Sequence, residues 1–342
     1  MRTLLSFIVI FGFLGCSEYK KSHRFTEVVV ETIFNDSISI RALEVMDGSV
    51  AFAANNGIFG AIDLRTHQIR TNQQVLDSIT PEFRAIAHTK TDFFMLSAGR
   101  PALLYKTGDT GQMELVYKEN SEGVFYDSMR FWNDKEGIAI GDEMQGCLSI
   151  LITRDGGQTW IKVRCEDLPP AIAEEGAFAA SNTNIAIAGN KTWIGTTESR
   201  VFYSRDTGRT WEIFTTPFIN TKPTEGIYSL DFFDDTLGVM VGGDYTNPEG
   251  KNANKAITKD GGKTWQLIAE GKNPGYKSCV QFVPNAGGKD LVSVGFTGIS
   301  YSEDMGNSWT ELSTESFYTI RFSNDSTAYA AGKNRIARLS FK

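Results

Sequence analysis

The sequence predicts an all-β fold: a seven-bladed β-propeller whose ring is closed by the N-terminal strand. Three observations lead to this prediction: a turn motif that recurs four times, seven short apolar segments between the turns, and no segment of helical periodicity beyond residue 24. The 342 residues include 33 glycines and 12% aromatic residues, a composition that favours strands joined by tight turns. No linker divides the chain, so one domain is expected over residues 25–342.

The recurring motif reads Ser/Thr-x-Asp-x-Gly-x-Ser/Thr-Trp. Its complete copies span residues 153–160, 204–211, 258–265 and 302–309, and a decayed copy at 107–111 lacks the Trp. The Asp carboxylate accepts free backbone N–H groups of a tight turn, and the Gly adopts a backbone conformation that other residues resist. The Trp begins the next strand and packs into the sheet. We therefore expect a structural role for the following residues: Asp155, Trp160, Asp206, Trp211, Asp260, Trp265, Asp304 and Trp309.

A spacing of roughly 45 residues between copies suits a four-stranded blade, with the motif in the hairpin between the third and fourth strands. Seven apolar segments align as second strands: residues 50–54, 93–97, 137–141, 184–188, 238–242, 291–295 and 328–332. The last blade, from Phe317 onward, has room for only three strands, whereas residues 25–33 form a strand with no blade of their own. The N-terminal strand is therefore expected to complete the last blade and to remove its free edge.

The first residues have the layout of a bacterial export signal. Arg2 precedes an apolar run over residues 4–14, which is shorter than the roughly 20 residues that a membrane-spanning helix needs. Residues 13–16 end in Gly-Cys and resemble a lipobox, although Phe13 departs from its usual aliphatic residue. We expect a signal peptide over residues 1–15, a lipid on Cys16 that anchors the protein to the membrane, and a tether over 16–24. A plain signal peptide with an incidental cysteine is the alternative.

The residues after Cys16 favour the outer membrane of the bacterial envelope, with the periplasmic or surface face left open. Exported proteins keep disulfides. Cys147 and Cys165 lie symmetrically about residue 156, in the hairpin of the first complete motif, so a cross-strand disulfide is predicted; two separate buried thiols are the alternative. Cys279 lies in an apolar strand and is expected to be a buried free thiol.

Charge and motif content exclude several functions. The net charge is −7 and no basic run occurs, so nucleic acid is not an expected partner. The sequence has no dinucleotide-binding glycine motif, and its three histidines lack metal-ligand spacing. We therefore expect no cofactor and no metal, and a monomer is predicted.

The loops that enter the first strands, and those that join second to third strands, meet at one rim of a propeller, opposite the motif turns. Arginines there clamp carboxylates, and tyrosines offer stacking surfaces. The candidate ligand-binding residues on this rim are Arg41, Arg84, Arg100, Asp127, Asp142, Glu175, Glu225, Asp244, Tyr245, Tyr276 and Lys277. The alternative is that these charges pair with one another and seal a narrow channel.

A sialidase-like glycoside hydrolase is the enzymatic alternative. Such enzymes use an arginine triad, here Arg41, Arg84 and Arg100, and a tyrosine nucleophile activated by a glutamate, here Tyr276 with Glu225. Each choice has several rivals in the sequence, so no catalytic residue is predicted. A surface protein without any ligand is the third hypothesis, and a sealed channel would favour it.

Four further segments, 39–43, 126–131, 137–142 and 242–245, accompany the motif, which is the Asp-box or bacterial neuraminidase (BNR) repeat. Over residues 25–342 the chain resembles the photosystem II assembly factor-like propellers of non-photosynthetic bacteria, which often carry the label "oxidoreductase". The resemblance implies a seven-bladed propeller in a lipid-anchored or periplasmic setting and no established reaction. We therefore expect a binding or assembly-factor scaffold that holds a protein segment or an anionic ligand on its rim, with a carbohydrate as the alternative ligand.

Overall fold

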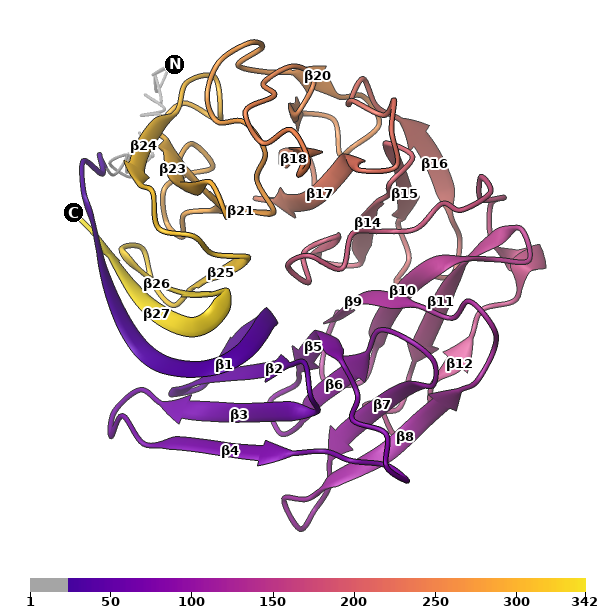
Figure 1. Ribbon diagram of the computed structural model, residues 1–342. Helices are drawn as coiled ribbons and strands as arrows, with labels where there is room; N and C mark the ends of the chain where they lie inside the picture. The colour runs from indigo at the N-terminus through magenta and orange to yellow at the C-terminus, as the bar shows by residue number, and fades with distance from the viewer. Residues whose placement is uncertain (1–23) are drawn as a thin grey trace, which may run out of the picture.

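The computed structural model describes residues 24–342, and this part of the chain is built almost entirely of antiparallel strands. Five four-stranded sheets and one seven-stranded sheet stand side by side around a common centre, as blades do in a propeller (Figure 1). The only helical element in the described range is a 3₁₀ turn, Cys165–Asp167. The all-β prediction is therefore confirmed.

Each four-stranded sheet runs from an innermost strand near the centre to an outer strand at the periphery (Figure 1). The sheets are β5 (Phe83–His88), β6 (Phe93–Ser97), β7 (Ala102–Thr107), β8 (Met113–Glu119); β9 (Tyr126–Phe131), β10 (Gly137–Met144), β11 (Cys147–Thr153), β12 (Ile161–Lys162); β13 (Ile185–Ala188), β14 (Lys191–Gly195), β15 (Arg200–Ser204), β16 (Glu212–Thr215); β17 (Glu225–Phe232), β18 (Gly238–Asp244), β19 (Lys255–Thr258), β20 (Gln266–Leu267); and β21 (Cys279–Phe282), β22 (Leu291–Gly295), β23 (Gly298–Ser302), β24 (Thr310–Ser313).

The long strand β1 joins the two ends of the chain into the seven-stranded sheet. The strands of this sheet, in spatial order, are β25 (Thr319–Phe322), β26 (Thr327–Ala331), β27 (Lys333–Phe341), β1 (Val28–Met46), β2 (Ser49–Ala54), β3 (Ile58–Asp63) and β4 (Ile69–Gln73). The first part of β1, from Val28 to Ser39, pairs with β27, and the part from Ile40 to Met46 pairs with β2. One strand thus connects the last strands of the chain to the first.

The four complete motifs, here called the repeat turns, form the same hydrogen-bonded structure. In the first, the Asp155 carboxylate accepts the backbone N–H of Thr159 at 3.0 Å and its hydroxyl at 2.6 Å, while Thr153 Oγ1 accepts the N–H of Gly157 at 2.9 Å. Gly157 has φ +78°, and a Cβ there would overlap the ring of Phe94. Only glycine satisfies both demands.

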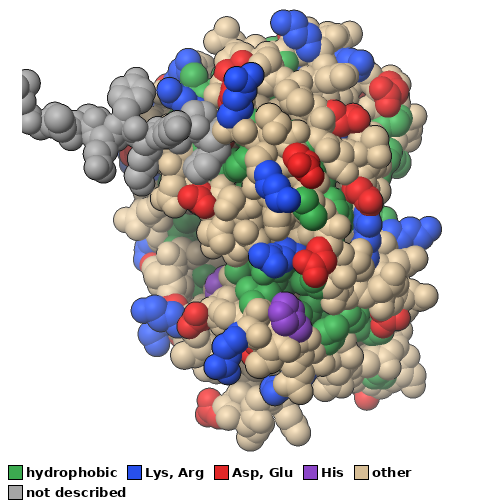
Figure 2. Space-filling model, turned by 90° about the vertical axis from the view of Figure 1, so that its left-hand side faces the viewer, with side chains coloured by type: hydrophobic (Ala, Val, Ile, Leu, Met, Phe, Trp, Pro, Cys, Tyr) green, Lys and Arg blue, Asp and Glu red, His purple; other side chains and the backbone are tan. Residues whose placement is uncertain are grey.

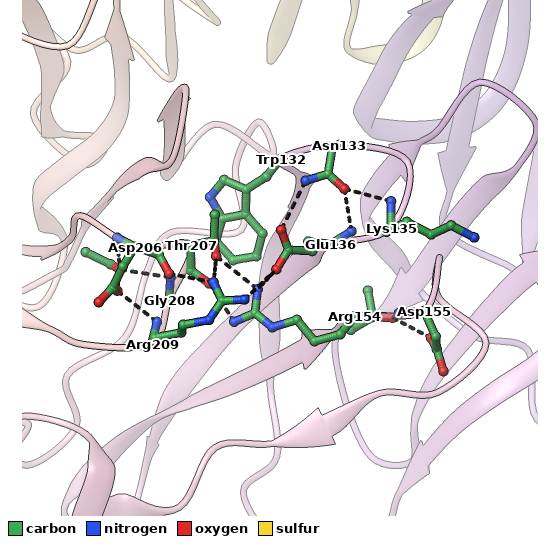
Figure 3. Close-up of polar contacts among 12 residues, drawn as sticks. Trp132, Asn133, Lys135, Glu136, Arg154, Asp155, Asp206, Thr207, Gly208 and Arg209 are labelled. Atoms are coloured by element: carbon green, nitrogen blue, oxygen red, sulfur yellow. Dashed lines mark hydrogen bonds and ion pairs between the residues drawn. The ribbon is translucent and has the colours of Figure 1, made fainter.

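Neighbouring sheets are tied together through these turns. Glu136, in the turn before β10, accepts Arg154 at 2.7 Å and Arg209 at 3.0 Å, so that two successive repeat turns converge on one carboxylate (Figure 3). Arg154 also donates to the backbone oxygen of Thr207 at 2.7 Å. The first two repeat turns therefore hold neighbouring sheets together through these ion pairs and hydrogen bonds.

One predicted strand assignment is wrong. Residues 184–188 were aligned as a second strand, but β13 is the innermost strand of its sheet and β14 is the second. The cause lies just upstream, because residues 177–183, here called the crossing segment, bond to other sheets rather than to a ladder (Figure 1, pink loop near the centre). The first ladder strand of this sheet consequently starts late.

The crossing segment fills the middle of the ring. Asn182 donates to the backbone oxygen of Ile86 at 2.8 Å and accepts the N–H of Met129 at 3.0 Å. Ser181 donates to the oxygen of Ser278 at 2.6 Å, and its own backbone oxygen accepts Thr319 Oγ1 at 2.9 Å. Residues on or next to four innermost strands are thus bridged, and the side chains of Ser181, Asn182 and Thr183 all have hydrogen-bond partners inside the protein.

The three described cysteines divide into a pair and a single thiol. Cys147 and Cys165 form a disulfide with their Cα atoms 5.4 Å apart, and Cys279 is free and buried. The predicted signal peptide, Cys16 and nearly all of the tether lie outside the described residues. Across residues 24–342 no helix has the length and apolar character needed to cross a bilayer. On the face in Figure 2, acidic and basic side chains are interspersed, without a large patch of one sign.

Candidate functional site

A cavity of about 490 Å³, here called the rim cavity, opens at the centre of one face of the ring. Four predicted rim residues line it: Arg41, Arg84, Tyr245 and Tyr276. The other lining residues are Phe178, Ala179, Ala180, Tyr228, Ser278, Phe296 and Tyr318. Most of these residues come from the entries to innermost strands, as the propeller argument predicted, and the volume suits a ligand pocket.

Aromatic rings form one continuous wall of the rim cavity. Phe178 stacks on Tyr228 with ring centroids 3.7 Å apart and planes 4° apart. Tyr228 meets the edge of Tyr276 at 4.8 Å, and Tyr276 lies 5.1 Å from Phe296. Phe178 belongs to the crossing segment, which therefore forms the floor of the cavity and closes it from below. A ligand can enter from the rim face.

Arg41 is the charged group that distinguishes this cavity. Its guanidinium lies 4.4 Å above the ring of Tyr318, and no ion pair to it forms among residues 24–342. Burial, followed by the nearby positive charge of Arg84, lowers the pKa of Arg41. A partly buried cation with only a ring beneath it is well placed to gain a carboxylate or phosphate partner.

Arg84 also lines the rim cavity but already has an ion-pair partner. Its Nε and Nη2 donate to Glu82 at 2.8 and 2.6 Å, and the Glu82 side chain is 50% exposed. Exposed ion pairs of this kind contribute little to stability, so the pair is exchangeable. Arg84 is therefore a second cation that an anionic ligand could recruit.

Asp127 and Asp142 lie together but do not line the cavity. Burial, followed by the neighbouring Asp142 carboxylate, raises the pKa of Asp127 well above its ordinary value. Burial raises the pKa of Asp142 to about 6. The two neighbouring carboxyls therefore take up protons more readily than isolated aspartates do, which reduces their negative charge.

The remaining predicted carboxylates are held by partners within the fold. Glu175 is fully buried and pairs with Arg200, whose Nε donates at 3.0 Å. Asp244 accepts Lys222 Nζ at 3.0 Å and the Thr246 N–H at 2.8 Å. For these residues the structure realises the alternative in which strand-start charges pair with neighbours.

Three other predicted positions also lie off the cavity wall. Glu225 accepts both the backbone N–H and the hydroxyl of Thr221 at 2.7 Å. Lys277 is 2% exposed and donates to the backbone oxygen of Gly298 at 2.8 Å, and its burial lowers its pKa to about 8. Arg100 is exposed on the loop after β6. The triad of Arg41, Arg84 and Arg100 is consequently not assembled around the cavity.

The sialidase-like nucleophile pair is not formed either. Burial raises the pKa of Tyr276, which opposes a phenolate, and no hydrogen bond joins Tyr276 to Glu225 in the described part of the chain. Within residues 24–342, no group of three or more His, Cys, Asp or Glu side chains is arranged to hold a metal ion.

An ionic cluster that sequence reasoning missed lies deeper in the ring. Glu44 is 6% exposed and accepts Arg130 at 3.0 Å and Arg321 at 3.1 Å. Burial opposes its ionisation, but the two guanidinium groups outweigh burial and lower the pKa of Glu44. The aromatic wall was missed as well, because Phe178, Tyr228 and Tyr318 look like ordinary strand aromatics in the sequence.

No protein-family model matches the chain, and no curated protein matches its sequence. Solved structures are nevertheless similar in fold. One is YCF48 bound to D1 peptide, with 13% identity and a TM-score of 0.66 over 94% of this chain and 97% of that chain.

Two other solved structures are also similar to this chain in fold. The RRP9 WD40 repeats give 9% identity and a TM-score of 0.62 over 94% of this chain and 99% of that chain. The structure of U3-55K gives 10% identity and a TM-score of 0.63 over 91% of this chain and 98% of that chain. WD40 repeats build propellers, and at these identities the likeness establishes the fold alone. The predicted β-propeller is therefore confirmed.

Proposed function

We propose that this propeller is a non-catalytic binding protein whose rim cavity holds an acidic segment of a partner protein. The observation that carries the proposal is Arg41, a partly buried guanidinium without an anionic partner among residues 24–342, set at an aromatic wall. A carboxylate of the partner would pair with Arg41, and apolar side chains beside it would pack on Tyr276 and Phe296. Arg84 would add a second contact after leaving Glu82.

The shape of the cavity supports a peptide end or tight bend as the occupant. The crossing segment closes the floor, so a segment cannot thread through the ring. Tyr245 and Phe296 are 49% and 40% exposed at the mouth, where they would contact the residues that lead into the cavity. One fold neighbour is a propeller bound to a peptide, which supports this type of ligand for the present chain.

The same proposal includes an exported, lipid-anchored setting. The disulfide between Cys147 and Cys165 suits an oxidising compartment, and Cys16 would carry the lipid at the bacterial outer membrane. We further propose seven Asp-box blades, with the Val28–Ser39 part of β1 as the outer strand of the last blade. The pairing of that part with β27 supports this closure.

Selection from a displayed random peptide library tests the function. The wild-type protein is expected to enrich peptides with acidic groups and aromatic or aliphatic neighbours. Arg41→Gln should raise the dissociation constants of the selected peptides at least about tenfold. Arg205→Gln is the matched control, because Arg205 is an exposed arginine in a repeat turn. Equal binding by both variants, or enrichment that ignores acidic residues, would refute the proposal.

A further inference from the structure

A second and larger cavity, of about 1100 Å³, opens between strands β1–β4 and the sheet β5–β8. We call it the inter-sheet cleft. Its walls include Ala51 and Phe59 on one side, His88, Phe93 and Met113 on the other, and Phe131 at one end. It shares no lining residue with the rim cavity.

In the next interface around the ring, three aromatic side chains fill the equivalent position. Phe94 stacks on Phe131 at 4.6 Å, and the Trp160 indole meets the edge of Phe131 at 5.7 Å with an interplanar angle of 89°. The interface at β17 repeats the arrangement. There Trp193 stacks on Phe232 at 3.6 Å, and Trp265 meets Phe232 at 5.9 Å and 90°. In both interfaces three aromatic rings pack between the neighbouring sheets, and we call this group of three rings the wedge.

Strand register identifies the residue that replaces the Trp in the inter-sheet cleft. In the repeat turns the first Ser or Thr stands opposite the Trp: the pairing of Tyr203 with Glu212 places Ser204 opposite Trp211. In the decayed turn, Thr107 pairs with Met113. The decayed turn is therefore one residue shorter, and Met113 occupies the position of the missing indole.

The other two members of the wedge are replaced as well. Phe131 pairs with Gly137 at the start of a second strand, and His88 pairs with Phe93 in the same way. Ala51 lines the cleft from the strand that faces this sheet, as Phe94 does in the next interface. Ala, His and Met thus stand where Phe, Phe and Trp fill the neighbouring interface, and the difference leaves the space open.

We propose that the inter-sheet cleft binds a fused-ring aromatic small molecule. The walls still carry Phe59 and Phe93 for stacking. Polar side chains, among them Thr107, Lys90 and Asp134, line the rest of the cleft, so a ligand that fits here carries polar substituents as well as rings. The charged atoms of Lys90 and Asp134 lie 3.9 Å apart, and both side chains are exposed.

His88 gives the cleft a hydrogen-bonding group. Its Nδ1 lies 3.8 Å from Glu44, whereas Nε2 has no partner among residues 24–342, and the side chain is 33% exposed. A single aromatic side chain of a partner protein would replace only one of the missing rings. A ligand of two or more fused rings with a polar substituent facing His88 fits the space better.

Ligand-observed NMR with indole, quinoline and acridine measures binding directly. Saturable binding is expected for the wild type, strongest for the larger rings. Met113→Trp rebuilds the wedge and should raise the dissociation constant at least about tenfold while it increases the melting temperature. Leu115→Trp is the matched control, because it adds the same ring two residues along β8 at a 40% exposed site outside the cleft.

The remaining variants make the outcome decisive. Ala51→Phe fills the cleft from the other wall and replaces Met113→Trp should that variant fail to fold. Arg41→Gln must leave binding of these probes unchanged, which separates the cleft from the rim cavity. The proposal is overturned if no fused-ring probe saturates, or if both filling variants bind the probes as tightly as the wild type does.

Discussion

Buried carboxyls at two places in the ring, Glu44 in the interior and the pair of Asp127 and Asp142 nearer the rim, shift their pKa values in opposite directions. In the interior, Glu44 is held by Arg130 and Arg321, and its pKa is lowered despite its burial. At the rim, Asp127 and Asp142 are buried together, and the pKa of each is raised. All three side chains are carboxyls, whereas their partners differ. Pairing with a guanidinium, rather than burial alone, therefore sets the direction of these pKa shifts.

The arginines repeat the contrast. Arg321 donates to Glu44 and to the backbone of Ile320 at 2.8 Å, so its guanidinium is satisfied within the fold. Arg41 has only the Tyr318 ring below it. An interior arginine with several partners stabilises the ring. In the proposed function, a rim arginine without a counter-ion is available to pair with an anionic ligand.

The largest effect is expected from Glu44→Gln. This change removes the carboxylate that Arg130 and Arg321 share and should lower the free energy of unfolding by about 3–5 kcal/mol. Arg41→Gln is the control and should cost less than about 1 kcal/mol, because it breaks no ion pair. Urea denaturation of the two variants measures both values. Equal costs would show that the interior and the rim do not differ in the way described.

The pH dependence of stability gives the second test. The folded pKa of Asp142 is raised to about 6, so the folded state binds more protons than the unfolded state between about pH 4 and 6. Stability from this group is present below pH 4 and is lost as the pH rises through 6, by on the order of 1–3 kcal/mol. Asp142→Asn should flatten this slope in denaturation curves at pH 4, 5, 6 and 7. A wild-type stability that rises over this range, with Asp142→Asn unchanged, would contradict the assignment.

Local signals made the fold predictable. Each repeat turn is specified within eight residues, since Asp155 and Thr159 bond to each other and Gly157 needs its own φ. The rim face was predictable too, because the entries to first strands converge in any propeller. Arg41, Arg84, Tyr245 and Tyr276 were identified on that basis and line one cavity.

The predictions that failed concern residues whose interaction partners lie far away in the sequence. Residues 184–188 look like a second strand, yet the crossing segment before them bonds to Ile86 and Met129 far away in the sequence. Glu175 looked like a rim acid because its partner Arg200, 25 residues later, carries no motif. Short-range patterns encode turns and strands, whereas the pairing state of a charge is decided by the assembled ring.

The smallest effect is expected from the pair that lies between the two extremes, Arg84 with Glu82. Glu82→Gln removes an exposed partner and should change the free energy of unfolding by less than about 1 kcal/mol. It also frees Arg84, so acidic peptides selected on the wild type should bind about two- to fivefold more tightly, in line with one modest ion pair. Titration calorimetry at low and high salt measures the gain, which should shrink as salt screens the charges. Unchanged affinity at low salt would mean that Arg84 takes no part in ligand binding and that Arg41 alone distinguishes the rim from the interior.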